Sequence, residues 1–196
     1  MSDPVSKRDL RIAIAKDLAG LSPDLRGTLD EQISQRLRAL NEFRGASQLL
    51  GYLPLDDEPN IVPVLEEAIV AGKRVYMPIV DEASMLHYVR WEPSDGRRAA
   101  AYGRWTPSSS EQPANVCSVV LVPGRAFDRD GYRLGRGKGC YDRSLGPMKP
   151  LGATVGIAYS VQLLSCVPRE QHDRPVDLIV TERETVRRSD VSTDHD

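Results

Sequence analysis

The stretch RLGRGKGCYDRSL, from Arg133 to Leu145, holds the residues whose types and spacing best suit phosphate chemistry. Gly135, Gly137 and Gly139 leave the backbone free to turn sharply and to aim several N–H groups at one anion. Between positions 125 and 143 six basic side chains stand against three acidic ones, in a chain whose net charge is −2. The pattern therefore predicts a local site for a phosphate-bearing ligand.

The two most familiar phosphate motifs do not fit this stretch. GxGxxG would require a glycine where Cys140 stands, and a P-loop would require a glycine and a hydroxyl residue where Tyr132 and Gly139 stand. A solvated basic turn is therefore the alternative interpretation.

Asp142 is a candidate oxygen ligand for Mg²⁺ beside bound phosphates, and equally an acid that stabilises a helix start. Asp173 is a second candidate for Mg²⁺, and equally a residue that closes a turn.

Two basic side chains near the N-terminus are candidates for the same anion. Lys7 and Arg11 are four residues apart, so they share one face of the helix that Leu10, Ile14 and Leu18 predict. Cations in the first turn of a helix oppose the helix dipole, which favours an anion nearby. A solvated helix face is the alternative interpretation of the pair.

Alternating helices and strands must position these residues. The pattern predicts one α/β domain over residues 1–186, built as three αβα layers around a largely parallel sheet with one antiparallel hairpin. In such sheets ligands bind beyond the carboxyl ends of the strands, and the glycine stretch follows one of these strands. The predicted helices cover 10–21, 25–40 and 60–71 with a short one from Cys140, and the strands cover 48–55, 74–80, 85–91, 119–122, 153–159 and 177–181.

Composition limits the classes of partner. The net charge of −2 predicts no nucleic acid and no membrane surface as partner, and no apolar run approaches the ~18 residues of a membrane span. Three cysteines and three histidines show no spacing typical of a disulfide framework or a transition-metal site. Residues 92–115 are the longest loop-like segment, and the tail 187–196 is predicted to be disordered. We expect a cytoplasmic monomer.

The chain carries, in this order, the motifs KRDLR (Lys7–Arg11), YLPLDDE (Tyr52–Glu58), GKRVYMP (Gly72–Pro78), VPGRAFDRDGYRLGRGKGCYDRSL (Val122–Leu145) and HDRPVDLIVTE (His172–Glu182). Together they resemble the motifs of the 5-formyltetrahydrofolate cyclo-ligase family, also called methenyltetrahydrofolate synthetase. The resemblance spans almost the whole chain and leaves only the tail unmatched. The long central motif is its most specific part.

The resemblance implies a three-layer α/β fold and an ATP- and Mg²⁺-dependent conversion of 5-formyltetrahydrofolate to 5,10-methenyltetrahydrofolate, with release of ADP and phosphate. In that reaction the formyl oxygen is phosphorylated, and N10 then closes the ring as phosphate departs. The residues at the family's ATP positions are Lys7, Arg11, Arg133, Gly135, Arg136, Gly137, Lys138, Gly139, Cys140 and Tyr141. Those at its folate positions are Leu53, Glu58 and Tyr141, and those at its magnesium positions are Asp142 and Asp173.

Three residues depart from the family pattern. Cys140 stands where the family commonly has an aromatic residue, and Thr106 where it usually has Glu or Gln. Arg125 replaces a small or apolar residue, and the sequence assigns no purpose to its charge. These departures leave a second hypothesis open, a non-catalytic folate- or nucleotide-binding relative of the same fold. A phosphosugar isomerase or a CoA transferase on a similar plan is a third and weaker one, because the acidic candidates would then have no role.

Overall fold

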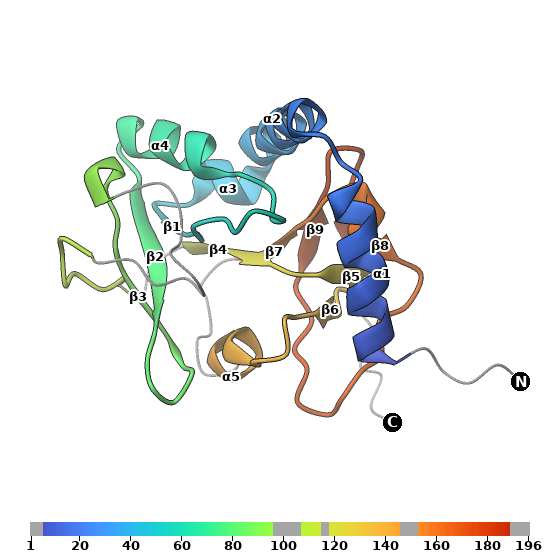
Figure 1. Cartoon of the computed structure of the whole chain (residues 1–196). Coiled ribbons are helices and arrows are strands. Elements are labelled where there is room, and N and C mark those ends of the chain that lie inside the picture. Colours follow the sequence, from blue (N-terminus) through green and yellow to red (C-terminus); the bar gives the residue numbers. More distant parts are fainter. Residues whose placement is uncertain (1–5, 96–106, 115–117, 146–152, 189–196) are drawn as a thin grey trace, which may run out of the picture.

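The computed structural model of the protein describes residues 6–95, 107–114, 118–145 and 153–188. Its main feature is a seven-stranded sheet with the strand order β10-β9-β7-β4-β1-β2-β3 (Figure 1). The strands of this sheet are β1 (Gln48–Leu50), β2 (Arg74–Val80), β3 (Leu86–Arg90), β4 (Ser118–Pro123), β7 (Thr154–Ile157), β9 (Leu178–Val180) and β10 (Thr185–Arg187).

The sheet is largely parallel, as the sequence predicts. Strand β1 pairs in parallel with β2 and β4, β4 pairs with β7, and β7 pairs with β9. Both edges are antiparallel, since β3 forms a hairpin with β2 and β10 pairs with β9. The α/β class and the β2–β3 hairpin are therefore confirmed, while the antiparallel pairs that involve other strands go beyond the single hairpin that we predicted.

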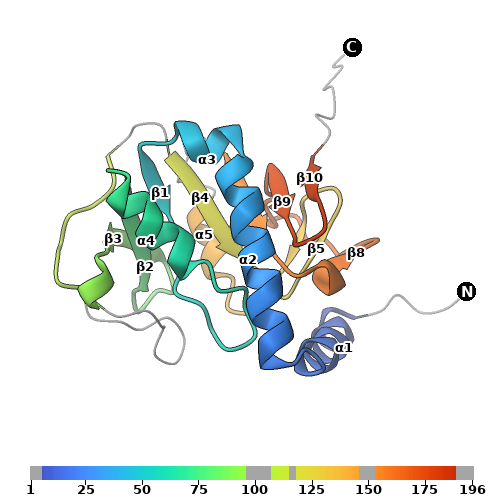
Figure 2. The same ribbon diagram turned by 90° about the horizontal axis from the view of Figure 1, so that it is seen from above.

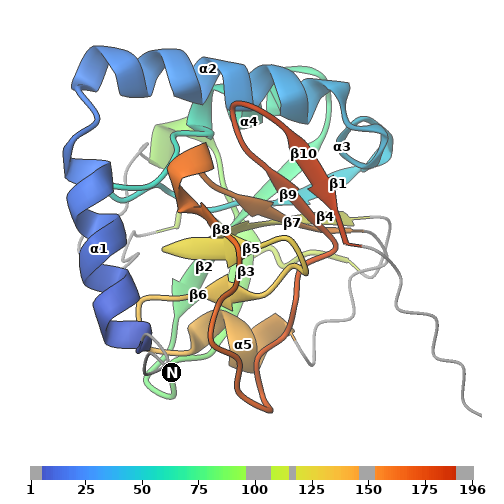
Figure 3. The same cartoon turned by 90° about the vertical axis from the view of Figure 1, so that its right-hand side faces the viewer.

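Helices lie on both faces of the sheet. Helices α2, α3 and α4 cover one face and the short helix α5 lies on the other, so the sheet is the middle layer, while α1 runs past its side (Figures 1 and 3). Seen from above, α2 and α4 lie over the central strands (Figure 2). The helices are α1 (Lys7–Ala19), α2 (Pro23–Ala39), α3 (Asn41–Gly45), α4 (Val62–Val70) and α5 (Cys140–Leu145), with the 3₁₀ turns η1 (Pro93–Asp95) and η3 (Ser160–Gln162).

Strand residues alternate between two apolar clusters, one on each face. Leu49 and Val75 belong to the cluster beneath the long helices, which also contains Leu37 of α2. Their neighbours Leu50 and Tyr76 belong to the cluster on the opposite face, against which the start of α5 packs. This alternation follows from the two-residue period of side chains along a strand, and it buries both faces of the sheet.

The first two helices begin at serine caps. Ser6 Oγ accepts a hydrogen bond from the backbone N–H of Asp9 at 3.1 Å, and Ser22 Oγ accepts one from Leu25 at 3.3 Å. Such caps satisfy N–H groups that have no partner within the helix. Helix α1 runs alongside the smaller sheet described next (Figure 3).

A second sheet of three strands was not predicted. It has the order β6-β5-β8 and consists of β5 (Ala126–Asp128), β6 (Arg133–Leu134) and β8 (Leu163–Leu164). Strands of two or three residues are too short for a period of two to be recognised in the sequence. As a consequence, Arg133 lies on a strand of this sheet, whereas the sequence placed it in a loop.

Two predicted boundaries were wrong. The strand predicted over 48–55 ends at Leu50, because residues 51–55 leave the sheet at its carboxyl edge. Arg187, which we placed in a disordered tail, lies in β10 and forms an ion pair with Glu42 at 2.6 Å. Residues 189–196 lie outside the described residues, as does Thr106. Among the described helices, none has the length and apolar character needed to cross a membrane.

Candidate active site

A cavity of about 400 Å³ opens at the carboxyl ends of β1, β2 and β4. Strand β1 lies between β2 and β4 in the sheet. The chain passes from β1 to β2 on one side of β1 and later forms β4 on the other side of β1. Connections that diverge in this way leave a crevice in which open α/β sheets bind ligands. Leu53 beyond β1, Pro78 near the end of β2 and Gly124 beyond β4 all contribute to its wall.

The glycine loop between β6 and α5 forms another part of the wall. Gly137 and Gly139 have φ values of +98° and +64°, a region that residues with a Cβ rarely adopt. Arg11 Nε donates a hydrogen bond to the carbonyl oxygen of Gly135 at 2.8 Å. Helix α1 is thus joined to the loop, and the cation of Arg11 lies at the loop's edge.

Arg133 is the most deeply buried cation in the wall, with only 3% of its side chain exposed. Its Nη2 donates to Asp142 Oδ1 at 2.7 Å, and its guanidinium carbon lies 5.0 Å from the centre of the Tyr141 ring. Its Nε and Nη1 are buried and have no acceptor among the described residues. A buried donor without a partner costs about 1–3 kcal/mol, so an anion bound here would be stabilised.

Tyr141 covers this guanidinium from one side. Burial raises the pKa of its phenol well above the ordinary value, and the nearby Tyr88 and Glu58 act in the same direction. The phenol therefore stays neutral across the physiological pH range. A neutral aromatic ring beside a cation suits a wall that faces a flat organic ligand.

Lys7 and Asp173 are paired with each other outside this wall. Lys7 Nζ lies 2.9 Å from Asp173 Oδ2 and 2.9 Å from Glu170 Oε1. Burial alone would raise the pKa of Asp173, but the hydrogen bond from Lys7 and the Glu170 backbone N–H lower it below the ordinary value. Among the described residues, no three His, Cys, Asp or Glu side chains form a group that could hold a metal ion.

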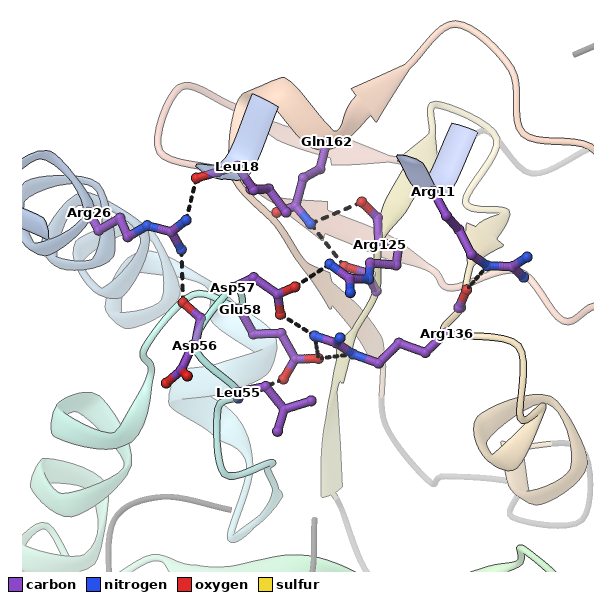
Figure 4. A network of polar contacts seen from close by, with 12 residues as sticks. Arg11, Leu18, Arg26, Leu55, Asp56, Asp57, Glu58, Arg125, Arg136 and Gln162 are labelled. Atoms are coloured by element: carbon purple, nitrogen blue, oxygen red, sulfur yellow. Dashed lines mark hydrogen bonds and ion pairs between the residues drawn. The ribbon is translucent and has the colours of Figure 1, made fainter. Parts of the chain in front are cut away.

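A chain of ion pairs joins the segment after β1 to the glycine loop (Figure 4). Arg136 donates to Glu58 Oε1 from Nε at 3.1 Å and from Nη2 at 3.0 Å, and it also contacts Asp57. Asp57 is in turn paired with Arg125. The other oxygen of Glu58 accepts a hydrogen bond from the Leu55 backbone N–H at 3.1 Å. Glu58 is thereby fixed, with only 8% of its side chain exposed.

The structure brings most of the predicted site residues together. Arg11 and Gly137 adjoin the cavity through the glycine loop, whereas Lys7 and Asp173 are not part of its wall. The predicted residues that line the cavity are Leu53, Glu58, Arg133, Gly135, Arg136, Lys138, Gly139, Cys140, Tyr141 and Asp142.

Sequence reasoning missed the tip of the β2–β3 hairpin. Asp81, Glu82 and Ser84 line the cavity, and Ser84 has a positive φ of 61°. The sequence predicts these residues only as the connection between the strands 74–80 and 85–91. A usable signal was present, because β2 is parallel to β1 and so the hairpin must turn at the same carboxyl edge as the glycine loop.

Comparison with known proteins identifies the family. The family model described as the 5-formyltetrahydrofolate cyclo-ligase family matches residues 3–182. The 5-formyltetrahydrofolate cyclo-ligase of Mycolicibacterium smegmatis is 30% identical over 186 residues, which cover 91% of this chain and 94% of the relative. That of Haemophilus influenzae is 28% identical over 181 residues, which cover 89% and 97%.

Solved structures agree with this assignment. The NMR structure of 5,10-methenyltetrahydrofolate synthetase from Aquifex aeolicus has a TM-score of 0.79 and 34% identity, and the match covers 94% of this chain and 93% of that one. The 5,10-methenyltetrahydrofolate synthetase from Mycoplasma pneumoniae has a TM-score of 0.70 and 25% identity, with 91% and 99% covered. With the cavity, the glycine loop and the five ordered motifs, these matches establish that the chain is an enzyme of the 5-formyltetrahydrofolate cyclo-ligase family.

Proposed function

We propose that the protein converts 5-formyltetrahydrofolate and ATP to 5,10-methenyltetrahydrofolate, ADP and phosphate, with Mg²⁺. The γ-phosphoryl group passes to the formyl oxygen, the N10 nitrogen attacks the activated carbon, and phosphate leaves as the ring closes. A formyl oxygen is a poor leaving group until it is phosphorylated. The protein's share of such a reaction is positioning and neutralisation of charge.

The observation that carries the proposal is the state of Arg133. Its guanidinium is buried in the wall of the cavity, and two of its nitrogens have no acceptor among the described residues. A phosphate oxygen is the ligand that best satisfies these donors, because guanidinium nitrogens bind phosphate through charge-assisted hydrogen bonds. The backbone of the glycine loop and the cation of Arg11 lie beside it and would hold the remaining phosphates.

Asp142 fits a role beside bound phosphates. Mg²⁺ in nucleotide sites is commonly held by one or two carboxylates, with phosphate oxygens and water completing the shell. Asp142 lines the cavity next to Arg133 with 15% of its side chain exposed, which supports it as a carboxylate ligand for Mg²⁺. Bound Mg²⁺ would supply neutralisation of the phosphate charge. Asp173 is the weaker candidate, because its carboxylate is paired with Lys7 outside the wall.

Glu58, Leu53 and Tyr141 are the proposed folate contacts. A carboxylate accepts paired hydrogen bonds from an amino group and an adjacent ring N–H, which is the pattern on the edge of a pterin. Leu53 and the Tyr141 ring provide apolar surface in the same cavity. The formyl group of a pterin held there would face the phosphate end of the same space.

The test is a coupled assay of product and ADP. Purified protein is mixed with 5-formyltetrahydrofolate, ATP and Mg²⁺, and the near-ultraviolet absorbance of the methenyl product is followed. Equal formation of ADP and methenyl product, abolished when ATP is omitted or Mg²⁺ is chelated, is expected. A folded protein that makes no ATP-dependent product overturns the proposal. Folate binding without ADP release would instead support the non-catalytic relative.

A further inference from the structure

Arg125 departs from the family pattern, yet its backbone is firmly held. It lies in the turn between β4 and β5, where its N–H donates to the carbonyl oxygen of Leu134 at 2.7 Å. Its own carbonyl oxygen accepts a hydrogen bond from Gln162 Nε2 at 3.0 Å. The position from which the Arg125 side chain extends is therefore fixed by β6 and by the Ser160–Gln162 turn.

The side chain of Arg125 points to the segment that carries Glu58 (Figure 4). It pairs with Asp57 Oδ2, while Asp57 Oδ1 contacts Arg136. Arg136 Nη2 is shared, since it also donates to Glu58 Oε1 at 3.0 Å. Asp57 thus stands between two arginines, one on a rigid turn and one on the glycine loop.

Burial makes this chain of contacts sensitive to the loss of a member. The exposed fractions are 19% for Arg125, 28% for Asp57 and 31% for Arg136. Burial alone would raise the pKa of Asp57, but Arg136 and Arg125 lower it, so the carboxylate stays charged. Without Arg125, Asp57 would depend on Arg136 alone. Arg136 Nη2 contacts both Asp57 and Glu58. A stronger interaction between Asp57 and Arg136 therefore weakens the interaction between Arg136 and Glu58.

We propose that Arg125 is a positioning residue for the substrate: through Asp57 and Arg136 it fixes the orientation of the Glu58 carboxylate that receives 5-formyltetrahydrofolate. The inference rests on the proposed function, because it assigns Glu58 to the folate. Arg125 itself contacts the Asp57 carboxylate, and the residue that touches the substrate is Glu58. Loss of Arg125 should therefore weaken the binding of folate more than the binding of ATP, for which Arg136 is one of several proposed ligands.

The main variant is Arg125→Met, which keeps the aliphatic length of the side chain and removes the charge. We expect its Kd for 5-formyltetrahydrofolate, measured by calorimetry without ATP, to rise about three- to tenfold. Its Kd for ATP should change less than its Kd for folate, and its melting temperature should fall, because the partly buried Asp57 loses one of its two arginines. Arg125→Lys keeps a cation opposite Asp57 and should restore most of the folate affinity. The matched control is Arg129→Met, because Arg129 lies just beyond β5 and its ion pair among the described residues is with Glu184, whose side chain is 43% exposed.

A double-mutant cycle tests the route. If Arg125 acts through Asp57, Arg125→Met should have almost no further effect on the folate Kd in an Asp57→Asn background. An unchanged folate Kd in Arg125→Met overturns the inference, and so does a loss of the same size in both backgrounds. The unaltered protein separates the two proposals. If it binds no 5-formyltetrahydrofolate, the proposed function fails and the inference fails with it, whereas binding with no effect of Arg125→Met overturns the inference alone.

Discussion

Two cations, Arg133 on β6 and Lys7 on α1, are each paired with an acid proposed for Mg²⁺, yet they differ in the donors that remain. Arg133 Nη2 is bonded to Asp142, while its Nε and Nη1 are buried without an acceptor in the part of the chain that the structure describes. Lys7 Nζ is bonded to both Asp173 and Glu170, and 22% of its side chain is exposed. The first cation is incomplete without a ligand, whereas the second is satisfied.

This difference predicts an order of importance for phosphate binding. A phosphate oxygen that reaches Arg133 gains hydrogen bonds from donors that otherwise remain unsatisfied. A phosphate oxygen that reaches Lys7 must first compete with two carboxylates for the same ammonium group. Removal of Arg133 should therefore cost much more activity than removal of Lys7, although both residues are at the family's ATP positions.

The largest effect is expected for Arg133→Met. Loss of a buried phosphate ligand should lower kcat/KM for ATP by about 10²- to 10³-fold. Initial rates of methenyl formation at varied ATP check this, with Arg129→Met as the control for loss of an arginine nearby. An ATP dependence equal to that of the unaltered protein would falsify the assignment of Arg133 to the phosphates.

A smaller effect is expected for Asp142→Asn, which keeps the shape of the side chain and removes its charge. The Mg²⁺ concentration that gives half of the maximal rate should rise about tenfold or more. Titration of Mg²⁺ at a fixed, saturating ATP concentration measures it. Asp173→Asn is the comparison variant, and a larger shift there than in Asp142→Asn would reverse our preference between the two acids.

The local features of the site could be predicted from the sequence, because each depends on residues close together in the chain. The turns at Gly137 and Gly139 and the place of the loop beyond a strand follow from residue types. The partners of the charged residues could not be predicted. Lys7 and Asp173 are 166 positions apart, so only the packing of α1 against the small sheet brings them together.

Arg125 illustrates the same limit in a single residue. The sequence shows an unexpected charge in the turn after β4 but does not show which acid it pairs with. Its partner Asp57 is 68 positions away, in the segment that leaves the sheet after β1. That segment is predicted to be strand as far as residue 55, whereas it leaves the sheet after Leu50, so the sequence does not indicate where Asp57 lies.

A weaker effect on activity is expected for Lys7→Met. Because Lys7 is shared between two acids and partly exposed, KM for ATP should rise by less than about tenfold with kcat nearly unchanged. Glu170→Gln, which removes one competitor for the ammonium group, should lower KM for ATP slightly or leave it unaltered. The contrast between the two cations would be wrong if Lys7→Met lost as much kcat/KM as Arg133→Met.

The smallest effect concerns stability against acid. The pKa of Asp173 in the folded protein is lowered below its ordinary value of 3.8, so its pair with Lys7 stabilises the fold above that pH and is lost as the pH falls through the folded pKa. At pH 6 the melting temperature of Lys7→Met should therefore lie below that of the unaltered protein. The corresponding loss in the free energy of unfolding should be less than about 1 kcal/mol. The difference should shrink as the pH falls below 3.8.

His172 requires a control in that experiment, because its Nε2 lies 3.8 Å from Asp173 and 3.4 Å from Glu170. The same pair of proteins is therefore compared in a His172→Asn background, where only the two acids and Lys7 remain in the cluster. A difference in melting temperature that stays constant down to pH 2.5 in both backgrounds would mean that Lys7 stabilises the fold without the charge of Asp173. In that case the pair with Asp173 would not explain why the ammonium group of Lys7 is satisfied. The contrast with Arg133 would then require another partner for Lys7.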